Sequence, residues 1–262
     1  MKEDTYSKHI EYKSICEKAS VDDETFNTFK GIPQYRTMLE HANNRQGQHH
    51  FSDLKNQTPE LLSHFDKFKT NDTIGNPTKF EYDGVGLVSS TTIQYVRVLS
   101  DLITYFGSLD RLKIVEIGSG YGGQCKIICD YFEPRSYVNF EMTEPSKLVF
   151  RYIDHFKINN AISVDAYIFL EHPHKIECDL VISNFAFSEQ SKHIQDIYLE
   201  YIIQPAKRGY LWMNESDQTY KIAGIKKLLT HKFKEKRDIP TERGTNRILY
   251  WNESPDTGKI LW

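Results

Sequence analysis

The chain has 262 residues, of which 39% are hydrophobic, and a formal net charge of −3. This size suits one large domain, or one domain with an appendage, and provides enough apolar material for a sizeable core. The small net charge excludes bulk attraction to nucleic acid or to an anionic membrane. No apolar run approaches the length of a membrane span, and the stretch 1–10 contains no apolar segment of a signal peptide.

The four cysteines do not form a recognisable metal or redox motif. They are Cys16, Cys125, Cys129 and Cys178, and none belongs to a Cys-x-x-Cys pair. Cys125 and Cys129 would share one face of a helix, where two small buried thiols explain them better than a metal site without partners. Because reduced thiols and the missing export signal favour the cytoplasm, we expect a cytoplasmic protein.

The N-terminal stretch, up to about Gly75, is polar. Its part 41–50 is rich in His and Asn and has no clear period, so it is predicted to be a loop. Helical patches flank it at about 6–19 and 58–69. Turn signals follow at Gly75-Asn-Pro77 and at Asp83-Gly-Val-Gly86.

A helix is predicted directly after these turns. Ser89-Ser-Thr-Thr92 supplies hydroxyl groups that are suited to cap its start. Apolar residues then follow at spacings that fit one helix face, namely Tyr95, Val96, Leu99, Leu102, Ile103 and Phe106.

From Leu112 onward, short apolar strands alternate with helical patterns. The strand candidates are 113–117, 137–142, a part of 161–169, 179–184 and 209–213. Five strands separated by helices predict a parallel sheet with helices on both faces. Two further strands, 232–239 and 246–251, are too close for a helical crossover, so they are expected to form a hairpin with one antiparallel member.

The predicted architecture is therefore an α/β, Rossmann-like sheet of seven strands, mostly parallel, with an antiparallel terminal hairpin. Residues 110–262 are expected to form this ligand-binding domain. Residues 1–109 are expected to form an N-terminal helical cap that serves as a lid or as the wall of the acceptor site. Ligands on such sheets bind at the carboxyl ends of the strands, near the switch in strand order.

A glycine-rich loop follows the first strand of this series. Gly118-Ser-Gly-Tyr-Gly-Gly123 satisfies the pattern G-x-G-x-x-G. Glycines let the backbone turn tightly and let a ligand approach where a Cβ would collide. The pattern alone fits a nicotinamide dinucleotide, S-adenosylmethionine or a plain structural turn.

Three features favour S-adenosylmethionine. Glu116 lies inside the strand, just before Gly118, and a carboxylate there gains nothing from an anionic pyrophosphate. S-adenosylmethionine instead carries a sulfonium and an ammonium and no phosphate. The loop also begins far into the chain, at Gly118, whereas dinucleotide folds often open with it. After the loop the chain holds one strand–helix series and a hairpin, with no second catalytic domain.

The second strand ends on two candidate ribose ligands. A carboxylate about 20 residues beyond the glycines can accept both ribose hydroxyls. Glu141 and Glu144 both follow Gly123 at close to this spacing. Glu141 is preferred because it ends the apolar run, although either residue also fits a solvated acid near a helix start. The predicted cofactor-binding residues are Glu116, Gly118, Ser119, Gly120, Tyr121, Gly122, Gln124, Glu141, Met142, Asn184 and Phe185.

The stretch Val115–Gln124 resembles the first motif of the class I S-adenosylmethionine-dependent methyltransferases. Together with Gly75–Pro77, Val88–Tyr95 and Asp179–Glu189, it resembles more narrowly the sugar O-methyltransferase family, over about residues 70–255. The resemblance implies O-methyl transfer to a sugar or small polar precursor of a surface polysaccharide such as a capsule, including phosphorylated or nucleotide-linked precursors. The chain departs from the family at Glu141-Met-Thr-Glu144, where an Asp-Leu-Pro-like run is usual.

Candidate catalytic residues follow the fourth strand. Methyl transfer is an in-line displacement that positioning accelerates, and a sugar hydroxyl benefits from a base. Asn184 ends the strand and is suited to orient the acceptor or the cofactor amino group, while Phe185 and Phe187 can exclude water. Glu189 and His193 are four apart and are predicted to pair on a helix face as base and orienter. The alternative is a helix-start acid and an unrelated surface histidine.

Acceptor contacts are predicted from the front helix as well. Arg97 is expected to serve an anionic group of the acceptor, and Tyr95 either contacts the acceptor or belongs to the core. Phe187, after the fourth strand, is also expected to contact the acceptor. No metal is expected, because no acid cluster lies near Asn184.

Two other functions remain open on the sequence. One is an NAD-linked oxidoreductase, and the other is a non-catalytic binding protein that keeps the fold. The expected partner is a small-molecule acceptor. No nucleic acid is expected because the chain has no basic stripe, and an oligomer is left open.

Overall fold

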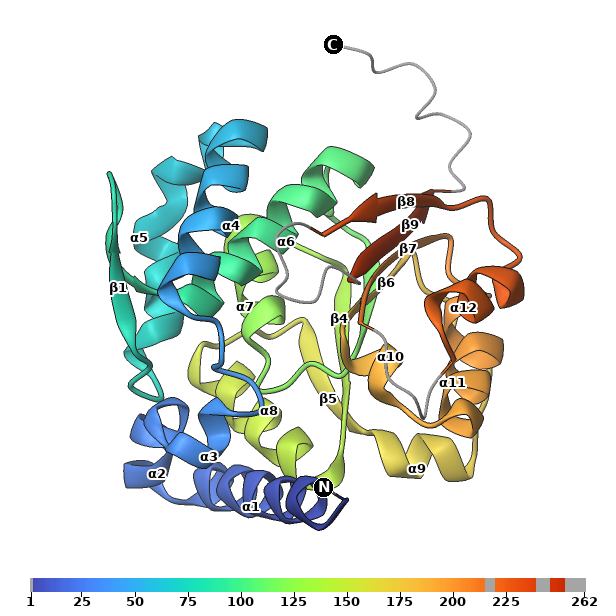
Figure 1. Cartoon of the computed structure of the whole chain (residues 1–262), viewed down its shortest axis with the longest axis horizontal. Coiled ribbons are helices and arrows are strands. Elements are labelled where there is room, and N and C mark those ends of the chain that lie inside the picture. Colours follow the sequence, from blue (N-terminus) through green and yellow to red (C-terminus); the bar gives the residue numbers. More distant parts are fainter. Residues whose placement is uncertain (1, 215–219, 239–245, 253–262) are drawn as a thin grey trace.

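The computed structural model describes residues 2–214, 220–238 and 246–252. Its central feature is a seven-stranded sheet with the order β5-β4-β3-β6-β7-β9-β8 (Figure 1). The strands are β3 (Lys113–Ile117), β4 (Ser136–Glu141), β5 (Ala161–Asp165), β6 (Leu180–Asn184), β7 (Arg208–Met213), β8 (Lys234–Arg237) and β9 (Arg247–Asn252). The predicted fold class, α/β with a mostly parallel sheet, is confirmed.

The predicted antiparallel pairing of the terminal hairpin is confirmed. β8 and β9 run antiparallel to each other, and β9 also pairs antiparallel with β7. The residues that connect these two strands, 239–245, lie outside the described ranges. The strand order reverses beside β3, because the chain moves outward through β4 and β5 and then returns to β6 on the other side of β3. Such a reversal opens a crevice at the carboxyl ends of β3 and β6, where ligands of open α/β sheets bind.

Helices cover both faces of the sheet (Figure 1). On one face lie α6 (Ser90–Phe106), α7 (Gly123–Tyr131) and α8 (Thr143–His155). On the other lie α9 (Ala166–Glu171), α10 (Ala186–Glu189), α11 (Lys192–Tyr198), a π-helical turn at Leu199–Ile203 and α12 (Ile222–Leu228). The helix predicted after the front turns is α6, and the side chain of Ser89 caps it by accepting a hydrogen bond from the backbone N–H of Thr92.

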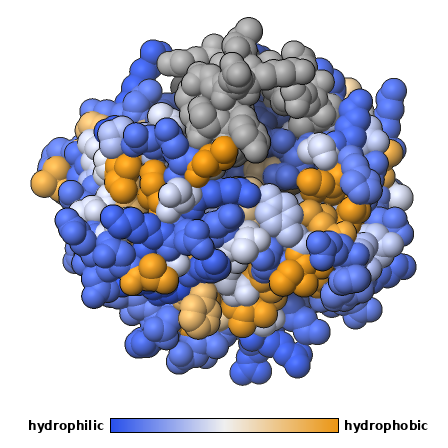
Figure 2. Space-filling model, turned by 90° about the horizontal axis from the view of Figure 1, so that it is seen from below, coloured by the Kyte–Doolittle hydropathy of each residue, from blue (hydrophilic) through white to orange (hydrophobic). Residues whose placement is uncertain are grey.

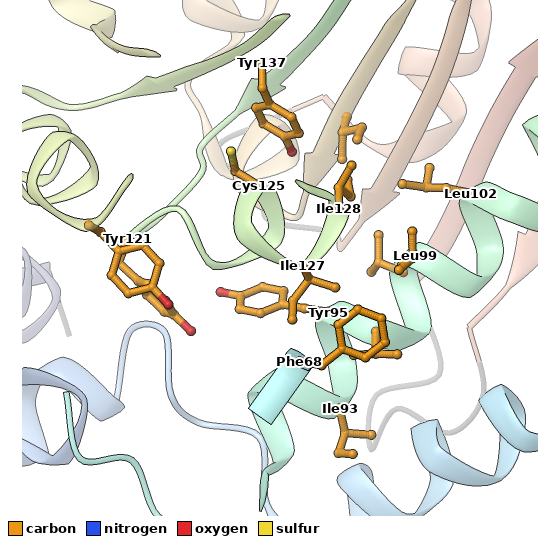
Figure 3. Packing of buried hydrophobic residues seen from close by; sticks show 14 of the residues in the cluster. Phe68, Ile93, Tyr95, Leu99, Leu102, Tyr121, Cys125, Ile127, Ile128 and Tyr137 are labelled. Carbon is orange, nitrogen blue, oxygen red and sulfur yellow. The ribbon is translucent and has the colours of Figure 1, made fainter. Parts of the chain in front are cut away.

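Two apolar clusters lie on the two faces of the sheet. Alternate residues of β3 point to opposite faces, so that Ile114 joins one cluster and Val115 joins the other. The first cluster includes Leu99 of α6, Ile128 of α7 and Tyr137 of β4 (Figure 3). This cluster also takes in residues from the N-terminal segment, including Tyr12, Phe29, Phe51 and Phe68. The N-terminal segment and the sheet therefore share one core.

The N-terminal segment is built from short helices around a small hairpin. Its elements are α1 (Lys2–Val21), α2 (Asp23–Thr28), a 3₁₀ turn at Phe29–Gly31, α3 (Pro33–Arg36), α4 (Asn44–Gln57), a 3₁₀ helix at Pro59–His64, α5 (Phe65–Phe68), a 3₁₀ turn at Lys69–Thr73, β1 (Lys79–Tyr82) and β2 (Gly86–Ser89). β1 and β2 pair as a separate antiparallel hairpin, and the turn signals at 83–86 connect them.

The loop predicted for 41–50 is wrong, because α4 begins at Asn44. Asn43 and Gln46 form a reciprocal capping box at its start, and Gly47, His50 and Leu54 are buried on one side. A Cβ on Gly47 would lie 2.0 Å from the hydroxyl of Tyr82, so only glycine allows this close packing. The helical period was hidden because a glycine and a histidine occupy positions where apolar residues are usual.

The surface seen from below Figure 1 is mainly hydrophilic, with apolar side chains in small separate groups (Figure 2). Singly exposed apolar side chains are normal for a folded domain. Within the described ranges, none of the helices combines the length and apolar content of a membrane-spanning segment.

Candidate cofactor and acceptor site

The glycine loop leaves β3 at the crevice where the strand order reverses. Gly118 and Gly120 have φ angles of +74° and +62°, in the region that favours glycine. A Cβ on Gly118 would lie 2.0 Å from the Cβ of Ala186 at the start of α10. A Cβ on Gly120 would lie 2.9 Å from Leu39 of the N-terminal segment. The loop is therefore closely packed from both sides, by α10 and by the residues that follow α3.

Glu141 ends β4 and points at this loop. Its Oε2 accepts a hydrogen bond from the backbone N–H of Gly120 at 2.8 Å, and its Oε1 accepts one from the N–H of Met142 at 2.9 Å. The side chain is buried, and burial raises the pKa of the carboxyl group to about 7, although the two backbone N–H groups oppose the rise. Glu144, the other candidate, lies on the first turn of α8, 3.6 Å from the Nζ of Lys13.

Glu116 lies one strand away and is more deeply buried, with 2% of its surface exposed. Its Oε2 accepts a hydrogen bond from the hydroxyl of Tyr137 at 2.8 Å. Burial, assisted by the charge of Glu141, raises the pKa of Glu116 to about 8, while Tyr137 and the nearby amide of Asn184 oppose the rise. The charges of the two carboxyl groups thus influence each other, in surroundings that disfavour their charged forms.

Several buried polar atoms of the glycine loop, the first turn of α7 and the end of β6 make no hydrogen bond within the described structure. They are the Oγ of Ser119, the Oε1 of Gln124 and both amide atoms of Asn184. Asn184 thus lies near Glu116, but the two side chains are not placed to form a hydrogen bond. Because buried polar groups are almost always hydrogen-bonded, such a group of unpaired atoms is typical of a site that is completed by a ligand.

Phe185 follows Asn184 in a strained backbone conformation, with φ of 69° and ψ of −38°. Such angles are rare for a residue with a side chain and concentrate at functional sites. The backbone N–H of Phe185 donates to the carbonyl of Trp212 at 2.6 Å, and the two rings lie 4.5 Å apart. The neighbouring strand therefore holds Phe185 in place at the carboxyl end of β6.

The predicted pairing of Glu189 with His193 on one helix face is wrong. α10 ends at Glu189 and α11 begins at Lys192, with the extended residues Gln190 and Ser191 between them. The Oε1 of Glu189 accepts a hydrogen bond from the Nδ2 of Asn214 at 2.7 Å. The side chain of Glu189 is therefore oriented by the end of β7, and His193 is exposed on a different helix.

Three predicted ligand contacts have side chains inside the core. Phe187 is fully buried in the cluster on the α11 side, and Tyr121 and Tyr95 are buried on the α6 side, where their rings meet edge to face (Figure 3). The hydroxyl of Tyr121 accepts a hydrogen bond from Asn71 at 3.0 Å. A ligand at the loop can therefore contact the backbone of Tyr121, while the expected acceptor contacts of Tyr95 and Phe187 do not fit this packing.

Arg97 is buried as well, but its charge is compensated. Its Nη1 lies 3.1 Å from Asp101 and its Nη2 lies 3.7 Å from Asp238. The guanidinium lies over the ring of Trp212 at 5.0 Å. The expected role of Arg97 with an anionic acceptor group would require a ligand to compete with two carboxylates.

The N-terminal segment and β7 also bring residues to the carboxyl-end edge of the sheet that the sequence did not indicate. Leu39 covers Gly120, and His50 meets Trp212 edge to face at 5.9 Å. The aromatic residue at the end of the fifth strand and the His49–His50 pair were the available signals. They carried no information on their own, because only the fold places them together.

Among the residues that the structure describes, no three His, Cys, Asp or Glu side chains come together in a way that could hold a metal ion. The absence of a metal from the reaction stays a prediction.

No family model matches this chain, and no curated protein matches it. Solved structures do show likenesses. An S-adenosylmethionine dependent methyltransferase from Mesorhizobium loti is 10% identical with a TM-score of 0.46, and the match covers 57% of this chain and 94% of that one. The PH0226 protein from Pyrococcus horikoshii OT3 is 13% identical with a TM-score of 0.47, covering 62% and 89%. The protein 1320 of Thermoplasma acidophilum is 11% identical with a TM-score of 0.47, covering 76% and 98%.

With identities of 10–13% and TM-scores of 0.46 and 0.47, these likenesses leave the function to be inferred from the residues of this chain.

Proposed function

We propose that this chain is an S-adenosylmethionine-dependent methyltransferase that transfers the methyl group to a hydroxyl of a sugar or small polar precursor. One observation carries the cofactor part of the proposal. Two buried carboxyl groups, Glu116 and Glu141, flank a glycine loop that a Cβ would obstruct. Burying a carboxylate is costly unless it is paired, and S-adenosylmethionine would bring an ammonium group to one of these carboxyl groups and ribose hydroxyls to the other.

The residues present fit this cofactor. Glu141 would hold the ribose hydroxyls, and Glu116 with Asn184 would hold the ammonium group. The unpaired Oγ of Ser119 and the unpaired amide of Asn184 supply further hydrogen bonds. The glycine loop would lie beside the methionyl part, and the positive φ angles of Gly118 and Gly120 let the chain bend there.

A nicotinamide dinucleotide fits these residues less well. Its pyrophosphate would place negative charge beside Glu116 and Glu141, whose charged forms are already disfavoured by burial. A non-catalytic binding protein is compatible with the same cofactor site and differs only in turnover.

The chain's own residues would then position the acceptor and handle one proton. Bound S-adenosylmethionine supplies a methyl group on a positively charged sulfur, so that transfer breaks the S–C bond, forms a C–O bond and releases the hydroxyl proton. Glu189, oriented by Asn214, is the proposed base. Phe185 and Trp212, whose rings lie 4.5 Å apart, exclude water from the place of transfer. The surface-polysaccharide context is implied by the family resemblance.

Isothermal titration calorimetry tests the cofactor assignment. S-adenosylmethionine and S-adenosylhomocysteine should both bind with micromolar dissociation constants, and Glu141→Ala should weaken both at least tenfold. Glu144→Ala is the matched control, because this acid follows the same strand but pairs with Lys13, and its effect should stay below threefold. If neither compound binds the intact protein, the proposal is wrong.

A further inference from the structure

The connection between α3 and α4, residues 37–43, packs against the glycine loop. It leaves α3 in a turn in which the backbone N–H groups of Met38 and Leu39 both donate to the carbonyl of Tyr35, at 3.0 and 3.1 Å. The side chain of Leu39 then reaches Gly120, where a Cβ would lie 2.9 Å from it. This connection therefore brings the N-terminal segment into contact with the proposed cofactor site.

The two ends of this connection are anchored, whereas its middle has no hydrogen bonds. Just before it, Tyr35 is fully buried, and its ring lies 4.9 Å from the ring of Phe29. At its other end, Asn43 forms the capping box of α4. The backbone groups of residues 40–42 form no hydrogen bond with the described part of the chain. The middle of the connection can therefore shift without breaking hydrogen bonds, and segments of this kind open easily.

Glu40 lies in this middle part and is buried, with 8% of its surface exposed. Its Oε1 has no hydrogen-bond partner among the described residues. Burial raises the pKa of Glu40, and the charge of Lys30 opposes the rise. The Nζ of Lys30 is engaged elsewhere, because it donates to the carbonyl of Asn71 at 2.7 Å and lies 4.1 Å from the centre of the Tyr121 ring. A buried carboxylate in this position would gain from a further cation.

The charge of Glu40 acts on the same place as the charges of the two acids in the proposed cofactor site. Burial raises the pKa of the Tyr95 hydroxyl, and the charges of Glu40, Glu116 and Glu141 all raise it further. Interactions between charges weaken with distance, so the three carboxyl groups lie around one hydroxyl group. They come from three separate parts of the chain, namely the α3–α4 connection, β3 and β4.

The ammonium group of S-adenosylmethionine needs more acceptors than the sheet supplies. A protonated amino group carries three N–H donors. In the proposed function, Glu116 and Asn184 accept two of them, and one oxygen of Glu116 already accepts a hydrogen bond from Tyr137. The unpaired Oε1 of Glu40 is available as the third acceptor. Hydrogen bonds between two charged groups are among the strongest in proteins.

We propose that Glu40 is a ligand of the cofactor's ammonium group, supplied by the N-terminal segment instead of the sheet. This inference rests on the proposed function and adds a binding residue to it. A shift of residues 40–42 brings the Glu40 carboxylate onto the ammonium, and the positive charge of the ammonium compensates the buried carboxylate. The cofactor is then held between two parts of the chain, and Glu40 makes the protein selective for a ligand that carries the amino group.

Isothermal titration calorimetry on the full chain tests this inference with two probes. They are S-adenosylhomocysteine and its deamino analogue, which keeps the carboxylate and lacks only the amino group. Wild type should bind S-adenosylhomocysteine at least about tenfold more tightly than the analogue, with the weaker ligand measured by displacement. Glu40→Gln keeps the shape of the side chain and should reduce this preference at least fivefold. It should do so by weakening S-adenosylhomocysteine alone, with the analogue unchanged within twofold.

Three further variants complete the experiment. Glu40→Asp keeps the charge on a shorter side chain and should lose part of the preference, and this variant decides the question if Glu40→Gln does not fold. Glu60→Gln replaces an exposed acid of the same segment and should change neither affinity. Glu141→Ala should weaken both ligands alike, because both contain the ribose.

Three results would overturn the inference while S-adenosylhomocysteine still binds to wild type. They are equal binding of both ligands by wild type, a preference that the Glu40 variants leave unchanged, and an equal loss of both ligands in those variants, which would indicate general damage to the site. All three leave the proposed function intact. Failure of wild type to bind S-adenosylhomocysteine would instead refute the proposed function.

Discussion

The hydroxyl of Tyr137 donates a hydrogen bond to Glu116 at 2.8 Å, across the adjacent parallel strands β4 and β3. Both side chains lie on the face that α6 and α7 cover, and both are almost completely buried. This contact keeps one oxygen of Glu116 satisfied inside the core while the carboxyl group stays at the crevice. It links the stability of the sheet to the ionisation of the proposed cofactor ligand.

The ligand-free protein should lose stability as the pH rises from about 5 to 8. The folded-state pKa values of Glu141 and Glu116 are raised to about 7 and about 8, whereas unfolded glutamate titrates near 4.3. Over this range the folded state binds more protons than the unfolded state, so the free energy of unfolding falls with pH. Urea denaturation at pH 5, 6, 7 and 8 measures it. A Glu116→Gln variant should show a smaller slope, and an equal slope would contradict the assignment.

The affinity for the cofactor should rise with pH, whereas the stability of the ligand-free protein falls. A cationic ligand favours the ionised carboxyl groups, so binding of S-adenosylmethionine at pH 6.5 should release protons and become tighter toward pH 8. Calorimetry in buffers of different ionisation enthalpy counts these protons. S-adenosylhomocysteine has no sulfonium charge and should release fewer. Proton uptake on binding would contradict the roles given to Glu116 and Glu141.

Replacing Tyr137 with Phe should affect both properties. The substitution leaves a buried oxygen of Glu116 without its donor, which costs about 1–3 kcal/mol of stability. It should also raise the pKa of Glu116 further, because the hydroxyl favours the ionised form. The affinity for S-adenosylmethionine should therefore fall severalfold at pH 7 and recover at pH 9. A loss of affinity that is the same at both pH values would indicate general damage to the site.

Two glycine variants should separate backbone strain from crowding. Gly118→Ala introduces a Cβ 2.0 Å from Ala186, at a residue with φ of +74°. Left-handed backbone and overpacking together should cost about 3 kcal/mol. Gly84→Ala is the matched control, since its φ is +80° and its Cβ would meet nothing within 4 Å. It should cost about 1 kcal/mol. Urea denaturation of both variants measures the difference, and equal losses would mean that α10 yields to the extra methyl group.

Removing the Arg97 charge should destabilise the protein strongly. Arg97→Met leaves Asp101 and Asp238 buried with one fewer cation between them, which should cost about 3–5 kcal/mol. Asp238→Asn in the same chain should restore part of this stability, because an amide oxygen can still accept the hydrogen bond from Trp212 at this position. Chemical denaturation of the single and double variants provides the test. A double variant that is less stable than Arg97→Met would contradict the charge pairing.

The sheet could be predicted from the sequence because its signals are local. Each parallel strand is a short apolar run, and the glycine loop directly follows β3. Glu141 could be placed for the same reason, since it is the residue on which β4 ends.

The rest of the site depends on contacts between distant segments. Leu39 meets Gly120 and His50 meets Trp212, and no period or motif records pairs that lie so far apart along the chain. The break between α10 and α11 was missed for a local reason. The hydroxyl of Ser188 bonds back to the carbonyl of Phe185, which favours a short turn where the spacing of Glu189 and His193 indicated a continuous helix.

The shared core of the N-terminal segment and the sheet limits how this protein can be rebuilt. Tyr12, Phe29 and Phe68 pack in the same cluster as Leu99, Ile128 and Tyr137. A chimaera that joins the sheet of this chain to the N-terminal segment of another protein would have to match this packing before it could fold. The N-terminal segment therefore cannot be exchanged as a separate module without rebuilding the core that it shares with the sheet.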